Sequence, residues 1–90
     1  MKLSNRSQYA CLALITLARE KDSGERRTIA EIAEEQNIPK KYLEQILLTL
    51  KRTGYVMSYK GPTGGYRLRK EPEEISVAEV IRLFDGPIAP

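Results

Sequence analysis

Two short amphipathic helices separated by only a few residues are the feature that most constrains how this chain can fold. Thr28 is followed three residues later by Glu31, which is the spacing of a capping box at a helix start. This helix is expected to end near Asn37, because asparagine tolerates the left-handed backbone found at helix ends. Pro39 suits the first position of the next helix, which should stop at Thr53-Gly54. Two helices spaced in this way match a helix-turn-helix.

A β-hairpin is expected directly after the second helix. Residues 55–59 are rich in β-forming side chains, and residues 66–69 alternate between apolar and basic ones. The intervening residues 60–65 include three glycines and a proline, a composition that favours a turn. A hairpin in this position is a wing. The predicted fold class is therefore mainly α with a small β-hairpin, a winged helix-turn-helix.

Helices are expected on both sides of this unit. Ser4 can cap a helix that runs to about Lys21, and residues 9–15 are apolar nearly all round, which suits a buried helix or one shared with a second subunit. Ser76 and Glu79 have the spacing of a second capping box.

One domain over residues 1–90 is expected, because a chain of this length has room for only a modest core. Its predicted parts are the helix-turn-helix at about 28–53, the wing at about 55–69 and a closing helix at about 76–85. The inner face of that closing helix should consist of Val77, Val80, Ile81 and Phe84.

Positive charge is concentrated in the middle of the chain. Residues 38–70 carry eight basic side chains and one acidic one, whereas residues 1–37 are neutral and residues 71–90 sum to −4. A basic segment between less basic flanks is typical of a surface that binds a polyanion such as nucleic acid. A solvated basic face is the alternative.

The second helix of the pair predicts two faces. An inward face is formed by Leu43, Ile46, Leu47 and Leu50. The opposite face then carries Lys41, Gln45, Leu48 and Arg52, with Glu44 on its flank. An ordinary amphipathic surface helix would show the same pattern, so the two faces alone leave the function open.

If this helix reads DNA, its N-terminal part contacts base edges in the major groove. Gln45 can bond an adenine edge with two hydrogen bonds, and Glu44 can accept from a cytosine amino group. The remaining basic residues, which are Lys40, Lys41, Lys51 and Arg52, suit phosphates, which position a protein without carrying sequence information.

The wing tip offers a second contact. Residues 60–65 lack the lysine and hydroxyl pair of a nucleotide-binding loop. Glycines such as Gly64 and Gly65 allow a backbone to approach a phosphate or enter a narrow groove. Lys60 before the loop and Arg67 after it are expected to bracket that approach. A plain hairpin turn is the alternative.

The chain has few residues suited to catalysis or metal binding. The chain has no histidine, and its one cysteine, Cys11, lies in an apolar run that predicts a small core residue rather than a nucleophile or ligand. We therefore expect no enzyme activity, no cofactor and no metal. The sequence shows no signal peptide and no apolar run of the roughly 20 residues that span a bilayer, which favours a cytoplasmic protein without membrane contact.

Five parts of the chain together form a specific signature: Lys2-Leu3-Ser4 with Tyr9-Ala10, Ile32-Ala33-Glu34, Tyr42-Leu43-Glu44-Gln45-Ile46-Leu47, Gly61-Pro62-Thr63-Gly64-Gly65-Tyr66-Arg67-Leu68 and Ile75-Ser76-Val77-Ala78-Glu79-Val80-Ile81. In this order, over nearly the whole length, they resemble the Rrf2 family of bacterial transcription regulators. The Tyr-Leu-Glu-Gln and Gly-Pro-x-Gly-Gly-Tyr pieces carry most of the specificity.

The resemblance implies a dimeric repressor or activator that binds near-palindromic promoter sites. It also implies that Lys41, Tyr42, Glu44 and Gln45 face the major groove and that the wing enters the minor groove. The position of Lys60 is often arginine in that family; lysine keeps the charge but loses the planar guanidinium.

Three departures from the family pattern stand out. The family's early Lys-Gly-Arg-Tyr-Ala is Arg6-Ser7-Gln8-Tyr9-Ala10 here, which removes one basic residue near the first helix. Leu48 occupies the outward face, where it could meet a thymine methyl group or a partner chain. Relatives that bind an iron–sulfur cluster carry three cysteines and a long pairing helix beyond the segment that corresponds to this chain.

The leading hypothesis is sequence-specific binding of double-stranded DNA by a homodimer of the intact protein. A winged-helix module that docks onto another protein is the second hypothesis, favoured by Leu48 and the apolar first helix. A third, an iron–sulfur sensing regulator, applies if the chain is a fragment of a longer protein. A regulator that reads its signal through a partner protein fits the residues present better.

Overall fold

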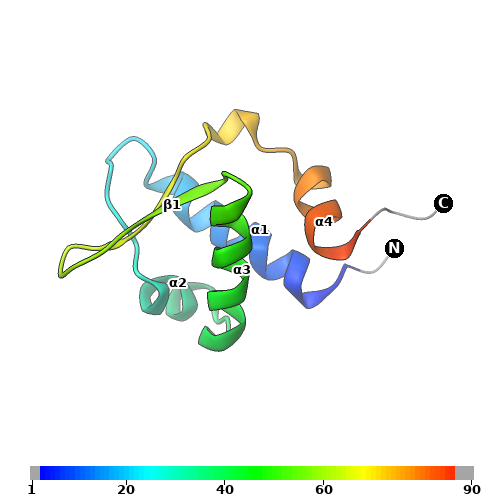
Figure 1. The fold of residues 1–90 in the computed structure, drawn as a ribbon, viewed down its shortest axis with the longest axis horizontal. Coiled ribbons are helices and arrows are strands. Elements are labelled where there is room, and N and C mark those ends of the chain that lie inside the picture. The colour runs from blue at the N-terminus through cyan, green and yellow to red at the C-terminus, as the bar shows by residue number, and fades with distance from the viewer. Residues whose placement is uncertain (1–2, 87–90) are drawn as a thin grey trace.

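The computed structural model describes residues 3–86. Its elements in chain order are α1 (Asn5–Arg19), α2 (Ile29–Gln36), α3 (Lys40–Arg52), β1 (Val56–Tyr59), β2 (Gly65–Leu68), the short 3₁₀ helix η1 (Pro72–Glu74) and α4 (Val77–Asp85). Figure 1 shows α3 crossing α1, with the hairpin projecting on one side of the pair and α4 lying on the other. This is the mainly helical winged helix-turn-helix that the sequence predicts.

Helix ends follow the capping residues closely. The Ser4 hydroxyl accepts from the Ser7 amide at 3.1 Å, so α1 begins at the expected position. Thr28 and Glu31 form the reciprocal capping box that starts α2. Asn37 ends α2 in the left-handed conformation with φ of 54°. Local chemistry therefore fixes where the first two helices begin and where α2 turns toward α3.

Two helix starts differ from the prediction in the details of their caps. Pro39 is the N-cap of α3 rather than its first helical residue, since its ψ of 127° is extended. Proline disfavours the helical conformation in the residue before it, so α3 cannot begin before Pro39, and Pro39 itself takes the extended backbone of an N-cap. Ser76 caps α4 by accepting from the Glu79 amide at 3.3 Å, but the reciprocal half of a capping box is not formed there.

The core lies where α1, α3 and α4 meet. All four inward-facing residues predicted for α3 are buried: Leu43, Ile46, Leu47 and Leu50. They pack with Ala10, Ala13, Leu14 and Leu17 of α1 and with Val80 and Phe84 of α4. Burial of each large apolar side chain stabilises the fold by about 1.5–3 kcal/mol relative to its exposure. This packing holds α3 with its polar face toward solvent.

The hairpin is antiparallel and pairs Val56 with Leu68 at its base and Tyr59 with Gly65 near its tip. A third segment joins it. The Arg27 amide donates to the Tyr66 carbonyl at 3.0 Å, and the Tyr66 amide donates back to the Arg27 carbonyl at 2.7 Å. The wing is therefore attached to the residues that lead directly into α2.

Two apolar positions are more exposed than expected. Val77, predicted on the inner face of α4, is 60% exposed, because it lies in the first turn beside a groove that no other element covers in residues 3–86. Cys11, predicted as a core residue, is only half-buried at the same groove. Of the helices in the described part of the chain, not one is long and apolar enough to cross a membrane.

Candidate nucleic-acid interface

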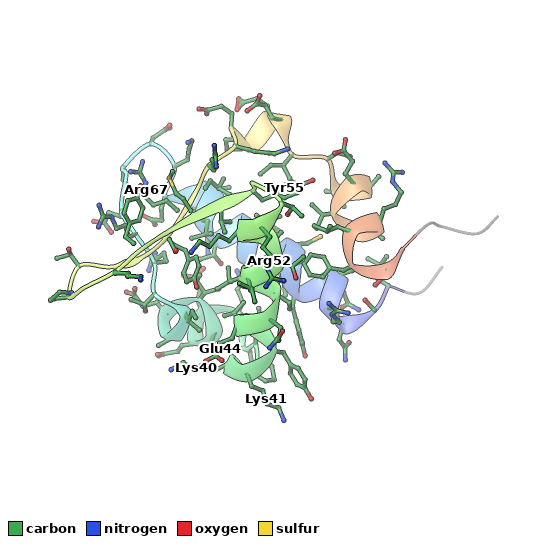
Figure 2. All side chains as sticks on the ribbon, viewed as in Figure 1. Lys40, Lys41, Glu44, Arg52, Tyr55 and Arg67 are labelled. Atoms are coloured by element: carbon green, nitrogen blue, oxygen red, sulfur yellow. The ribbon has the colours of Figure 1, made fainter. Side chains whose placement is uncertain are left out.

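The outward face of α3 is polar and largely basic. Lys40, Lys41, Tyr42, Glu44, Gln45, Lys51 and Arg52 are all exposed, as is Leu48. Figure 2 shows Lys40, Lys41 and Glu44 at the beginning of α3 and Arg52 near its end. With a rise of 1.5 Å per residue, the ends of this 13-residue helix lie about 18 Å apart. The structure thus groups the four predicted base-contacting residues in the first two turns and separates Lys51 and Arg52 from them.

Tyr42 projects from this face and is 49% exposed. The Lys41 ammonium lies 5.1 Å from the centre of its ring, within reach of a cation–π interaction. An aromatic side chain at the start of a helix, next to a lysine, provides a flat apolar surface and a hydroxyl for contact with a ligand.

The basic side chains of residues 38–70 are free of internal neutralisation. Within residues 3–86 the ion pairs join Arg19 to Glu35, Lys21 to Glu71 and Arg27 to Glu20. All three pairs lie outside the basic middle segment. Its positive charge is therefore available to a polyanion, because it is not paired with the protein's own carboxylates.

A groove separates the start of α3 from the wing. Lys40 and Glu44 line it from α3, and Lys60 and Tyr66 line it from the wing. Burial raises the pKa of the Tyr66 phenol, and the negative charge of Glu44 raises it further. Tyr66 therefore stays protonated at neutral pH and remains a hydrogen-bond donor in this groove.

The wing does not place its two flanking cations together. Lys60 lines the groove toward α3. Arg67, in contrast, lies against the loop between α1 and α2, with Nη2 3.6 Å from the position that a Cβ on Gly24 would take. Figure 2 shows Arg67 well away from Lys40 and Lys41. Lys60 and Arg67 therefore do not lie side by side, because side chains alternate between the two faces of a hairpin and the register pairs Arg67 with Met57. Their contacts with DNA stay a prediction.

Gly64 and Gly65 are required by the packing of the wing itself. A Cβ on Gly65 would lie 2.8 Å from the Arg27 carbonyl oxygen, and its φ of +133° strains other residues. A Cβ on Gly64 would collide with the Tyr59 carbonyl oxygen and would lie 2.9 Å from that of Gly61. The two glycines therefore have a structural reason to be present, whereas their contact with DNA stays a prediction.

Arg26 contacts the wing, although the sequence pattern does not reveal this contact. Its Nη1 donates to the Thr63 carbonyl at 3.1 Å, and its guanidinium carbon lies 3.6 Å from the centre of the Tyr59 ring. Residues 22–27 read as a polar connection between helices, and no local signal indicates that one of them reaches the hairpin. The backbone pairing of Arg27 with Tyr66 brings it there.

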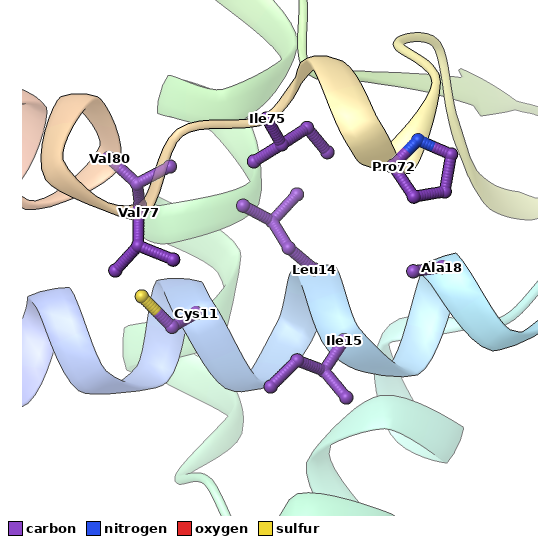
Figure 3. A pocket seen from close by; sticks show the side chains of 8 residues that line it. All are labelled: Cys11, Leu14, Ile15, Ala18, Pro72, Ile75, Val77 and Val80. Atoms are coloured by element: carbon purple, nitrogen blue, oxygen red, sulfur yellow. The ribbon is translucent and has the colours of Figure 1, made fainter.

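An apolar groove lies on another part of the surface. Figure 3 shows Cys11, Leu14 and Ala18 of α1 on the side toward Pro72, Ile75, Val77 and Val80, and Ile15 also lines the groove. The groove has a volume of about 180 Å³, and Ile15 at its edge is 53% exposed. Burial raises the pKa of the Cys11 thiol, which keeps it protonated and weakly reactive.

Comparison with known proteins finds relatives among transcriptional regulators. The family model Rrf2, described as an iron-dependent transcriptional regulator, matches residues 3–90. An HTH-type transcriptional regulator described as rrf2-like from Rhodobacter capsulatus is 46% identical over 98% of this chain and 60% of its own length. The chain thus spans about three-fifths of the length of such curated relatives.

Solved structures show the same fold. The global cysteine regulator CymR of Bacillus subtilis superposes with a TM-score of 0.90 at 36% identity, over all of this chain and 69% of that one. The T. potens IscR structure superposes with a TM-score of 0.86 at 35% identity, over 99% of this chain and 64% of that one.

The residues present do not fit an iron site. Residues 3–86 contain no group of three or more histidine, cysteine, aspartate or glutamate side chains that could hold a metal ion. Their one cysteine, Cys11, is a half-buried thiol among aliphatic side chains. Iron is held in proteins by several nitrogen, oxygen or thiolate ligands, so this groove lacks the donor set.

Proposed function

The chain belongs to the Rrf2 family of transcriptional regulators, and on this premise we propose that it is a domain that binds double-stranded DNA sequence-specifically. One observation carries the proposal. The outward face of α3 and the adjoining wing hold exposed basic side chains that form no ion pair within residues 3–86. DNA presents one negative charge per about 1.7 Å of helix axis, which makes it the natural partner of such a surface.

In the proposed complex the N-terminal turns of α3 enter the major groove. Lys41, Tyr42, Glu44 and Gln45 then meet base edges, with Gln45 suited to adenine and Glu44 to cytosine. Leu48 follows Glu44 by one helical turn and is 42% exposed. An exposed leucine on a polar face fits contact with a thymine methyl group.

The wing supplies a second contact in the adjacent minor groove. Lys60 is the cation best placed for it, because it lies at the tip and faces the same groove of the protein as Lys40. Arg67 points to the α1–α2 loop. It is therefore assigned a contact with a phosphate that lies on the side of the wing facing this loop. Lys51 and Arg52, at the far end of α3, are assigned to the phosphate backbone.

A homodimer of the intact protein is part of the proposal, since two copies would read the two halves of a near-palindromic site. The apolar groove between α1 and α4 gives a protein chain a place to pack, and a regulatory partner protein would use the same kind of surface. The cytoplasm, where the DNA is, is the expected location.

Selection from random duplexes tests the proposed function. The 90-residue chain is mixed with a random library at low salt, bound duplexes are recovered over several rounds, and their affinity is compared with that of unselected DNA by fluorescence anisotropy. We expect a recurring motif and an affinity ratio of about 10³ or more. No retention of DNA at low salt would overturn the proposal and would favour the winged-helix protein-docking alternative.

A further inference from the structure

We propose that Arg26 is a positioning residue for DNA binding, which holds the wing tip in a fixed place relative to α2 and α3. The inference rests on the proposed function, because it assigns a role within DNA binding. It concerns a residue outside the basic middle segment and outside both elements expected to touch DNA.

Arg26 makes two contacts, both with the wing. Its Nη1 donates to the carbonyl oxygen of Thr63 at 3.1 Å, which is a backbone group of the tip loop. Its guanidinium carbon lies 3.6 Å from the centre of the Tyr59 ring, a distance at which the planar cation stacks on the aromatic face. One side chain thus contacts both Tyr59, the last residue of β1, and Thr63 in the loop that follows it.

The tip has few other attachments. Residues 60–64 extend beyond the last paired positions of the hairpin, Tyr59 and Gly65. Within residues 3–86, apart from the strand ladder, the hydrogen bonds of this loop are one between the Gly64 amide and the Gly61 carbonyl and the one from Arg26. A two-stranded hairpin is only marginally stable by itself, so the contact with Arg26 limits the motion of the tip.

The backbone next to Arg26 is fixed by hydrogen bonds to the hairpin. Arg27 pairs with Tyr66 through two backbone hydrogen bonds, and Gly65 lets the two chains approach closely. The following residue, Thr28, is the N-cap of α2, and α2 leads through Asn37 into α3. Arg26 is therefore the side-chain link in a chain of contacts from the tip of the wing to the helix proposed to read bases.

Arginine suits this role better than lysine. A guanidinium can stack flat on a ring and donate in its own plane at the same time, whereas an ammonium has no planar face. Arg26 contacts Tyr59, the residue before Lys60 in the chain, so a displaced tip would move the Lys60 ammonium away from the minor groove. Arg26 is then expected to affect DNA binding through Lys60 rather than through a phosphate of its own.

The test combines four single variants with a double-mutant cycle, using fluorescence anisotropy on the duplex selected above. Arg26→Ala and Tyr59→Leu should each weaken binding about three- to tenfold, since each breaks the stack. Tyr59→Phe, which keeps the ring, should bind like the parent chain. Arg82→Ala removes one exposed arginine from α4, outside the proposed interface, and controls for the change in net charge.

The cycle distinguishes positioning from direct contact. In a Lys60→Ala background, Arg26→Ala should weaken binding by less than about twofold, because both changes remove the same wing contact. Additive losses, or a loss with Arg26→Ala but none with Tyr59→Leu, would overturn the positioning role and indicate a phosphate contact instead. Binding of the parent chain to the selected duplex establishes the proposed function separately from these outcomes.

A second measurement needs no DNA. Hydrogen exchange of the Gly64 amide should become faster in Arg26→Ala and Tyr59→Leu than in Tyr59→Phe, while exchange in α1 stays unchanged. Equal exchange at Gly64 in all variants would show that Arg26 does not hold the tip and would overturn the proposal, even if DNA binding itself is confirmed.

Discussion

The backbone amide of Ser4 donates a hydrogen bond of 3.2 Å to the carboxylate of Asp85, which ties the beginning of α1 to the end of α4. The Ser4 hydroxyl donates to the other carboxylate oxygen and also accepts from the Ser7 amide. A carboxylate at the C-terminal end of a helix interacts unfavourably with the helix dipole, and the hydrogen bonds from Ser4 offset this cost for Asp85. Its partner is 81 residues away in the sequence, which makes this contact a clamp between the two ends of the domain.

This clamp predicts a pH dependence of stability. Hydrogen bonding by Ser4 holds the pKa of Asp85 below its usual value. A lowered carboxylate pKa contributes stability that is complete above the unfolded value of about 3.9 and is lost as the pH falls through the folded-state pKa. Thermal unfolding of the parent chain and of Asp85→Asn should therefore differ more at about pH 6 than at about pH 2.5. A difference that does not shrink in acid would contradict the role of the ionised carboxylate.

The hairpin predicts unequal costs for two glycine substitutions. Both glycines have a positive φ, which strains an alanine. In Gly65→Ala the new Cβ also collides with the Arg27 carbonyl, whereas in Gly61→Ala the new Cβ meets no neighbouring atom. A strained backbone costs of order 1–3 kcal/mol, and the collision adds to this only at Gly65. Urea unfolding should show Gly65→Ala as the less stable of the two. Equal losses would indicate that Arg27 moves away at little cost.

Gln45 is predicted to determine sequence preference. Gln45→Ala removes an exposed side chain from α3, so the fold should keep its stability. If Gln45 bonds an adenine edge, the change costs about 1–3 kcal/mol on the selected duplex and nothing on random DNA. A repeated selection should show a relaxed preference at one or two base pairs. An equal loss on selected and random duplexes would assign Gln45 to the backbone instead.

Leu48 predicts a dependence on a single methyl group. Replacement of thymines by uracil, one at a time, removes only the C5-methyl group from the selected duplex. One such position should lower the affinity of the parent chain, and Leu48→Ala should be insensitive to the same replacement, because the apolar contact is already absent. Leu48→Ala that retains full sensitivity, or that changes self-association rather than DNA affinity, would place Leu48 at a protein contact.

Local signals in the sequence account for most of the fold. The Thr28–Glu31 capping box, Asn37 and the spacing of Leu43, Ile46 and Leu50 act within one or two helical turns, and each has its predicted structure. Their conformations depend on residues only a few positions away in the chain, which the sequence shows directly.

Long-range contacts account for what the sequence did not reveal. Arg26 meets Thr63 across 37 positions, and the facing of Arg67 depends on the hairpin register. The exposure of Val77 depends on what η1 and α1 leave uncovered, although its spacing in α4 is apolar. Periodicity shows which side chains share a face, but the packing of distant segments decides whether that face is covered.

Lys60 predicts the salt dependence of binding. As a wing cation free of ion pairs within residues 3–86, it should contact phosphate or the minor groove regardless of sequence. Lys60→Ala should weaken binding to selected and random duplexes alike and reduce the slope of log affinity against log salt by about 0.9. Arg82→Ala is the matched control, since it removes one positive charge from α4 and should leave the slope unchanged. If both variants change the slope equally, the effect comes from net charge and the wing makes no phosphate contact at Lys60.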